Sequence, residues 1–151
     1  MTGTYDRVIV LTGASGGIGE ALARELAAPG TYFSLIARDE TRLQRLLGEL
    51  REAGAEGEAR AIDIRDRDTL HSYLNELDTR FPVDLVIANA GVTAGLGPDR
   101  TRENDADSDR QIDVNYRGCV HTVTGIVDGM QTRRRGHIVL ISSLAGMRAL
   151  P

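Results

Sequence analysis

Lysine is absent from this sequence of 151 residues, and all 18 of its basic residues are arginine. This absence excludes a Walker-type phosphate loop, a Schiff-base nucleophile and any mechanism that uses an ammonium group. Because Cys119 is the single cysteine, the chain forms no internal disulfide. Apolar runs such as residues 8–11 and 138–141 are far too short to cross a bilayer. The sequence therefore predicts neither a disulfide scaffold nor a membrane protein.

Basic charge is not in excess either, since the net charge is −4 and the sequence pI is about 5.4. A composition of 41% hydrophobic and 26% charged residues indicates a folded globular chain and no nucleic-acid partner. The length fits one domain over residues 1–151. No signal peptide opens the sequence, so we expect the cytoplasm as its compartment.

Short β-branched runs alternate with longer segments of helical period, which is typical of successive βαβ units in a parallel sheet. The expected strands are residues 7–12, 32–37, 58–63, 84–89 and 137–142. Apolar stripes predict helices around residues 18–26, 43–50, 70–77 and 112–130. Ser108 and Gln111 have the spacing of a capping box, which predicts that the last helix begins near Asp109. Residues 92–107 are expected to form a long irregular loop.

A glycine cluster, residues 12–19, follows the first expected strand and opens the first helix. Glycines let the backbone turn tightly and approach a ligand closely, and the free N–H groups at a helix start favour an anion. The cluster therefore favours binding of a diphosphate, although an ordinary glycine-rich turn has the same composition.

A hydrolase is the alternative interpretation, because residues 13–17 also match the Gly-x-Ser-x-Gly nucleophile elbow, with Ser15 as the nucleophile. The available bases would be His71, His121 and His137. The first two fall inside expected helices, away from the carboxyl ends of strands where such sites form.

Three further motifs lie where strands end or in the following helix: Asn89-Ala90-Gly91, Asn115, and residues 141–146. With the glycine cluster they make the chain resemble the short-chain dehydrogenase/reductase family, apart from Ala88, where that family often has asparagine. The resemblance implies a Rossmann-like, doubly wound α/β fold of strand order 3-2-1-4-5 that stops before its last strands. It also implies contacts to a nicotinamide dinucleotide: diphosphate at Gly13, Ser15, Gly17, Ile18 and Gly19, adenine at Asp63 and Ile64, and nicotinamide ribose at Asn89, Ala90 and Gly91.

The end of the second strand indicates which cofactor is preferred. A carboxylate there would accept hydrogen bonds from a free ribose 2′-hydroxyl and repel a 2′-phosphate. The sequence instead has small Ala37 and then Arg38, whose guanidinium suits phosphate, so we expect NADP(H) over NAD(H). The alternative is that Arg38 only forms a surface ion pair with Asp39 or Glu40.

For catalysis, the resemblance assigns Ser143 to orienting an alcohol or carbonyl substrate and Asn115 to holding a proton-relay water. The family's tyrosine and lysine would fall after Pro151. Because a tyrosine needs an adjacent positive charge to act near neutral pH, we expect the 151 residues alone to be inactive. The alternative function is a non-catalytic nucleotide-binding or interaction fragment. An uncovered last strand predicts a homo-oligomer, another covering chain, or a fragment of a longer product. No metal site is predicted.

Overall fold

A computed structural model of the protein describes residues 5–94 and 103–147, and a parallel sheet forms its centre. The strand order is β3-β2-β1-β4-β5, as the sequence predicted. The strands are β1 (Arg7–Thr12), β2 (Thr31–Ala37), β3 (Glu56–Ala61), β4 (Leu85–Ala88) and β5 (His137–Leu140). The order reverses between β1 and β4, and in open α/β sheets ligands bind beside such a reversal, at the carboxyl ends of the strands.

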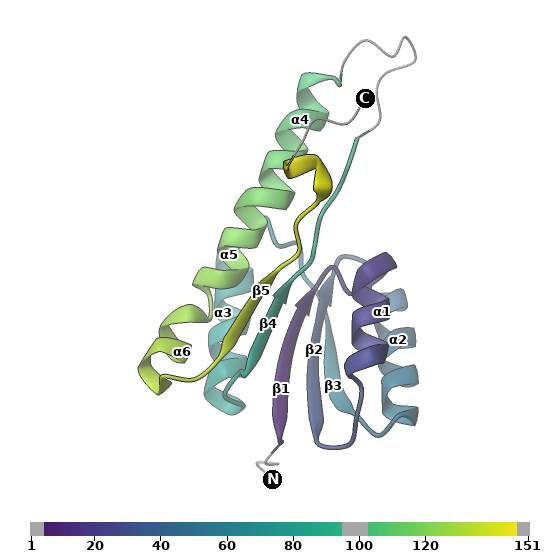
Figure 1. Ribbon diagram of the computed structural model, residues 1–151, viewed down its shortest axis with the longest axis vertical. Coiled ribbons are helices and arrows are strands. Elements are labelled where there is room, and N and C mark those ends of the chain that lie inside the picture. Colours follow the sequence, from purple (N-terminus) through teal and green to yellow (C-terminus); the bar gives the residue numbers. More distant parts are fainter. Residues whose placement is uncertain (1–4, 95–102, 148–151) are drawn as a thin grey trace.

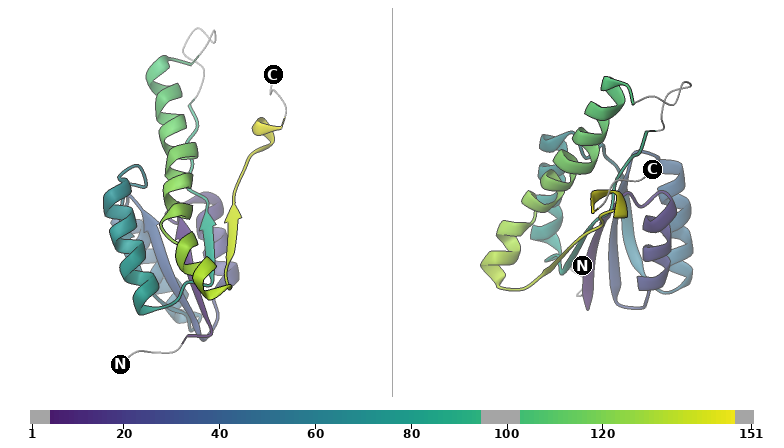
Figure 2. Two further views of the ribbon diagram at one scale, coloured as in Figure 1. Left: turned by 90° about the vertical axis from the view of Figure 1, so that its left-hand side faces the viewer. Right: turned by 45° about the horizontal axis from the view of Figure 1, so that its top comes forward.

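Helices cover both faces of the sheet, so the molecule has three layers (Figure 1). One face carries α1 (Gly17–Leu26) and α2 (Glu40–Glu52). The other carries α3 (Arg67–Arg80) and a long helical segment, which is divided into α4 (Asp105–Gln111), a π-helical stretch (Ile112–Gly118), α5 (Cys119–Thr124) and α6 (Val127–Arg133). The upper part of this segment projects past the carboxyl edge of the sheet in all views (Figures 1 and 2).

Alternate residues of the central strands supply two separate cores, because successive side chains of a strand point to opposite faces. Val8 and Val10 of β1 pack with the α3 leucines, whereas Ile9 and Leu11 pack with the α2 leucines. Every residue of β2 is buried, as expected for a strand with helices on both faces. Two filled cores hold the carboxyl ends of β1, β2 and β4 in fixed relative positions.

Three helices begin directly after a capping carboxylate or amide side chain: α2, α3 and α4. Asp39 and Asp66 accept hydrogen bonds from the backbone N–H groups of Arg42 (3.0 Å) and Thr69 (3.2 Å). Asn104 does the same for Asp107 at 2.8 Å, so α4 begins at Asp105. The capping box predicted at Ser108 and Gln111 is therefore wrong, since Ser108 lies inside α4. Residues 105–107 of the expected loop 92–107 are helical, and residues 95–102 of it lie outside the described residues.

Strand boundaries differ from the prediction mainly in β3, which begins and ends two residues before the expected range of 58–63. Its register with β2 pairs Glu56 with Tyr32 and Ala61 with Ala37. This edge strand carries alternating small and charged residues, so the sequence lacks the apolar run that marks a buried strand. The single helix expected over 112–130 is also interrupted, at Gly125 and Ile126, between α5 and α6.

Among the residues that the structure describes, β5 pairs only with β4, and no element covers its outer edge (Figure 2). All four of its residues are exposed, and Ile138, Val139 and Leu140 keep 36%, 40% and 56% of their surface accessible. Within the described ranges 5–94 and 103–147, no helix has the length and apolar character needed to cross a membrane.

Candidate cofactor-binding site

Two positions of the glycine turn between β1 and α1 are packed so closely that no side chain fits there. Gly13 has φ +67°, and a Cβ built on it would lie 2.7 Å from the Cα of Ala90. A Cβ on Gly19 would overlap the carbonyl oxygen of Gly13 and lie 2.9 Å from Asn89 Nδ2. These two glycines therefore allow β1, α1 and the end of β4 to meet.

Thr12 and Asn89 bond this turn to the end of β4. Asn89 Nδ2 donates to the carbonyl oxygens of Thr12 (3.2 Å) and Gly13 (3.1 Å). In return, Thr12 Oγ1 accepts from the backbone N–H groups of Asn89 (3.2 Å) and Ala90 (3.3 Å). Four hydrogen bonds thus fix the glycine turn relative to the segment 89–91.

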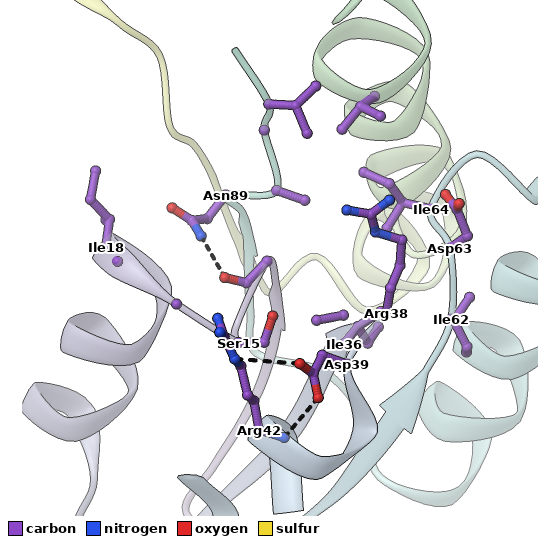
Figure 3. Close-up of a pocket in the computed structure, with 18 residues that line it drawn as sticks. Ser15, Ile18, Ile36, Arg38, Asp39, Arg42, Ile62, Asp63, Ile64 and Asn89 are labelled. Atoms are coloured by element: carbon purple, nitrogen blue, oxygen red, sulfur yellow. Dashed lines mark hydrogen bonds and ion pairs between the residues drawn. The ribbon is translucent and has the colours of Figure 1, made fainter. Parts of the chain in front are cut away.

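A cleft of about 750 Å³ opens at this carboxyl edge, at the reversal of strand order. Figure 3 shows its lining, which comes from the ends of β1, β2, β3 and β4 and from the helical segment beyond them. Ten of the eleven residues predicted to bind cofactor line it: Gly13, Ser15, Gly17, Ile18, Arg38, Asp63, Ile64, Asn89, Ala90 and Gly91. The eleventh, Gly19, is buried in the first turn of α1 beneath Gly13.

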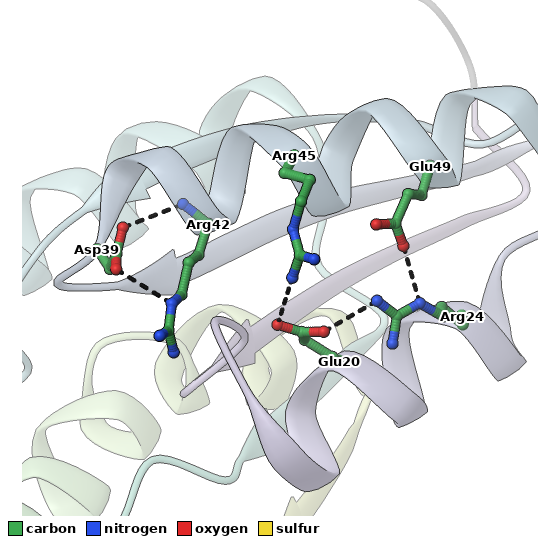
Figure 4. A network of polar contacts seen from close by, with 6 residues as sticks. All are labelled: Glu20, Arg24, Asp39, Arg42, Arg45 and Glu49. Atoms are coloured by element: carbon green, nitrogen blue, oxygen red, sulfur yellow. Dashed lines mark hydrogen bonds and ion pairs between the residues drawn. The ribbon is translucent and has the colours of Figure 1, made fainter.

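The start of α1 is an anion-favouring feature of the cleft. The first N–H groups of a helix have no intrahelical acceptor, and the helix dipole is positive at that end. Glu20 in this turn would oppose an anion, but it forms ion pairs with Arg24 (2.9 Å) and Arg45 (3.1 Å), as Figure 4 shows. Its charge is therefore compensated from the side of α1 that faces α2.

Arg38 directly follows β2, and its guanidinium lies in the cleft beside Asp63 and Ile64 (Figure 3). It forms no ion pair with Asp39 or Glu40. Asp39 is instead engaged by Arg42, which reaches it with Nε at 3.3 Å (Figure 4). The surface-pair alternative for Arg38 is therefore wrong in this structure.

Asp63 follows β3 at the same edge and is held ionised. Arg65 contacts both its carboxylate oxygens, with Nη2 at 2.6 Å from Oδ2 and Nε at 3.1 Å from Oδ1. The hydrogen bonds from Arg65 lower the pKa of Asp63 below its usual value, and the positive charge of Arg38 contributes in the same direction. A charged hydrogen-bond acceptor therefore lines this end of the cleft.

Asn115 and Ser143, the predicted catalytic residues, lie outside the cleft lining. The Asn115 side chain pairs with Val92, whose backbone N–H donates to Oδ1 at 2.7 Å and whose carbonyl accepts from Nδ2 at 2.8 Å. It thereby holds the chain that leaves Gly91. Ser143 is exposed beyond β5, and its carbonyl accepts from Gly146 N–H at 3.0 Å in a short 3₁₀ turn (Leu144–Gly146).

The hydrolase interpretation of Ser15 finds no support in this geometry. No histidine is among the residues that line the cleft around Ser15. His71 and His121 are bonded between α3 and α5, and His137 begins β5 at the opposite edge of the sheet. Ser15 therefore lacks the base that an acyl-transfer nucleophile needs.

Several lining residues were not predicted from the sequence, most clearly Arg42 and Val114. Arg42 lies in the first turn of α2, which begins at Glu40, and the cleft-facing place of that turn could be recognised only with the start of α2 known. Val114 comes from a distant helix, and nothing local in the sequence marks its position at the cleft.

A family model described as short chain dehydrogenase matches residues 7–151. The NADP-dependent 3-hydroxy acid dehydrogenase YdfG of Salmonella typhi is 31% identical over 140 residues, which are 92% of this chain and 55% of that protein. The chain belongs to the short-chain dehydrogenase family.

Solved structures agree with this assignment. A metagenomic short-chain oxidoreductase in complex with NADP has a TM-score of 0.87 at 34% identity, over 97% of this chain and 66% of the other. NAD⁺-bound xylitol dehydrogenase has a TM-score of 0.89 at 27% identity, and the match covers 98% of this chain and 57% of that protein. The chain thus spans little more than half of YdfG and of xylitol dehydrogenase, and 66% of the metagenomic protein.

Proposed function

We propose that this chain is the NADP(H)-binding part of an oxidoreductase that transfers hydride between the nicotinamide and an alcohol or carbonyl substrate. The observation that carries the proposal is the cleft at the strand-order reversal, where the glycine turn, Arg38 and Asp63 lie along one edge of the sheet. Its volume of about 750 Å³ is within the range of small-molecule and cofactor sites.

The residues present fit a dinucleotide. A Cβ built on Gly16 or Gly17 would meet no atom within 4 Å, so the backbone there is open to a ligand. Both residues line the cleft at the start of α1, where an anion is favoured. The backbone of residues 13–19 would therefore hold the diphosphate, and Asn89, Ala90 and Gly91 would lie against the nicotinamide ribose.

When bound, the nicotinamide supplies the hydride that reduces a carbonyl or is regained from an alcohol. The residues of this chain would bind the dinucleotide and orient it and the substrate. Asn115 fixes the backbone at Val92, next to the proposed nicotinamide end of the cleft. Ser143 is proposed to hydrogen-bond the substrate oxygen from the end of β5.

The fold matches both an NAD⁺-bound and an NADP-bound structure, so it does not by itself favour either cofactor. The proposed preference for NADP(H) rests on the residues around the end of β2. Ala37 leaves space, and Arg38 directs a guanidinium into the cleft. Asp39, whose charge would repel a 2′-phosphate, is already paired with Arg42. Cationic groups therefore dominate the place where a 2′-phosphate would lie.

The Arg38→Ala variant tests this proposal. Loss of a charge-assisted bond to phosphate costs about 1.5 to 3 kcal/mol, so we expect the Kd for NADPH to rise about 10- to 100-fold. The Kd for NADH should change by less than about threefold, because NADH has no 2′-phosphate. Both constants are measured by fluorescence titration.

Arg51→Ala is the matched control, since this arginine lies in the last turn of α2, outside the cleft. It should leave both constants unchanged. Equal losses for NADPH and NADH in the Arg38 variant would contradict the NADP(H) assignment.

Association with a second copy of this chain stays a prediction. The exposed apolar side chains of β5, together with Leu144 at 74% and Met147 at 84% exposure, support it, because such surfaces are usually covered by polypeptide.

A further inference from the structure

His121 lies on α5, outside the cleft, yet it is bonded to the cleft wall. Its Nδ1 is 3.1 Å from the carbonyl oxygen of Ile64, which directly follows Asp63. A carbonyl oxygen only accepts hydrogen bonds, so Nδ1 must carry the proton and donate it. The Nδ1–H donor of the ring is therefore directed at the segment after β3.

This segment has few ladder hydrogen bonds of its own. β3 ends at Ala61, and residues 63–66 form a turn closed by the Asp66 N–H donating to the Asp63 carbonyl at 2.9 Å. Before this turn, the Ile62 N–H donates to the Ala37 carbonyl of β2 at 3.0 Å. Beyond that bond, the position of Ile64 relative to the sheet depends on contacts from the helical segment. Ile64 is 6% exposed and shares a core with Val114.

The same helical segment holds both the backbone and the side chain of Ile64. A Cβ built on Gly118 would overlap Ile64 Cδ1, so the absence of a side chain at residue 118 leaves the space that Ile64 fills. His121, three residues later, reaches the Ile64 carbonyl. The His121 carbonyl in turn accepts from His71 Nε2 of α3 at 2.9 Å.

We propose that His121 is a positioning residue for adenine recognition, acting through the Ile64 carbonyl to place the Asp63–Ile64 wall. The inference rests on the proposed dinucleotide site. The ionised Asp63 carboxylate is a pure acceptor, and the 6-amino group of adenine is a donor that it can bind. Because Ile64 directly follows Asp63, a hydrogen bond that holds the Ile64 carbonyl also limits where the Asp63 carboxylate can lie.

The test compares the Kd for NADPH with that for its deamino analogue, in which hypoxanthine replaces adenine and the 6-amino donor is lost. We expect the wild-type chain to bind NADPH about 3- to 10-fold more tightly, the value of one hydrogen bond. In His121→Phe, which keeps a ring but lacks the donor, the ratio of the two constants should fall toward one.

Two amide variants keep the experiment informative if the phenylalanine variant does not fold. The asparagine amide in His121→Asn reaches the place of Nδ1, whereas the longer amide in His121→Gln reaches that of Nε2. We expect the asparagine variant to keep the NADPH preference and the glutamine variant to lose it. Val120→Ala is the control, because Val120 lies on the same helix but is an exposed side chain, and it should keep the wild-type ratio.

The possible failures are distinguishable. If the wild-type chain binds neither dinucleotide, the proposed function fails and this inference fails with it. If the wild-type chain binds without preferring NADPH, or if the phenylalanine and glutamine variants retain the preference, only the role of His121 is overturned. An equal loss of both ligands in those variants would indicate a purely structural role and would also overturn it.

Discussion

Gly19→Ala is expected to weaken NADPH binding about 10- to 100-fold and to destabilise the fold by about 1 to 3 kcal/mol. The added Cβ would overlap the Gly13 carbonyl oxygen and lie 2.9 Å from Asn89 Nδ2. Because these neighbours belong to the turn and its bonded partner, the start of α1 must move away from β1. The N–H groups proposed to hold the diphosphate move with it. Binding is measured by fluorescence titration and stability by urea unfolding.

Substitutions at two other glycines distinguish a loss of NADPH binding caused by an unstable fold from one caused by a side chain in the cleft. A Cβ on Gly48, inside α2, meets nothing within 4 Å, so Gly48→Ala should stabilise by about 0.5 to 1 kcal/mol and leave binding unchanged. A Cβ on Gly16 also meets no protein atom, but this residue lines the cleft. Gly16→Ala should therefore weaken binding while the fold stays stable, and full binding by this variant would contradict the proposed path of the diphosphate.

Asn89→Asp is expected to lower the free energy of unfolding by about 2 to 4 kcal/mol at pH 7. Asn89 Nδ2 donates to two carbonyl oxygens, and a carboxylate in its place would face both without a proton. The four hydrogen bonds between the turn and β4 would be reduced to those accepted by Thr12. NADPH binding should be lost with them, because the turn and segment 89–91 both line the cleft.

The effect of this substitution should depend on pH. Facing carbonyl oxygens disfavours the charged form, so the pKa of the introduced carboxyl is raised in the folded state. Stability relative to wild type should therefore be regained as the pH falls below that pKa and lost as it rises through it. Asn89→Ala, which introduces no titratable group, should show a difference from wild type that is the same at pH 4.5 and pH 7. Urea unfolding at both pH values measures this, and a pH-independent loss for the aspartate variant would contradict the assigned contacts.

The sequence was sufficient to predict the elements that positional patterns mark strongly. β1 was predicted at its observed bounds because its apolar run directly precedes a glycine turn, and the strand order is confirmed. β3 was displaced by two residues because an edge strand with small and charged residues has no clear pattern. The start of α4 was misplaced because Asn104, rather than Ser108, accepts the capping hydrogen bond.

For the residues that line the cleft, local sequence patterns were again sufficient only in part. Residues that belong to local motifs, such as Gly13, Asn89 and Gly91, were predicted and do line it. Contacts between distant segments were not predicted. The Thr12 hydroxyl bonds to residues 77 and 78 positions later, and Val114 reaches the cleft from the far helical segment. Only the folded chain brings these groups together.

The central claim is that backbone amides at residues 13–19 bind the phosphoryl groups of a nicotinamide dinucleotide. The most direct test is a titration of the ¹⁵N-labelled chain with NADPH, followed by backbone amide chemical shifts. We predict saturable shifts concentrated at residues 13–19, Arg38, Asp63, Ile64 and residues 89–91, with the amides of α6 unchanged. Saturable binding that leaves the amides of residues 13–19 unshifted, or no binding at all, would contradict the claim.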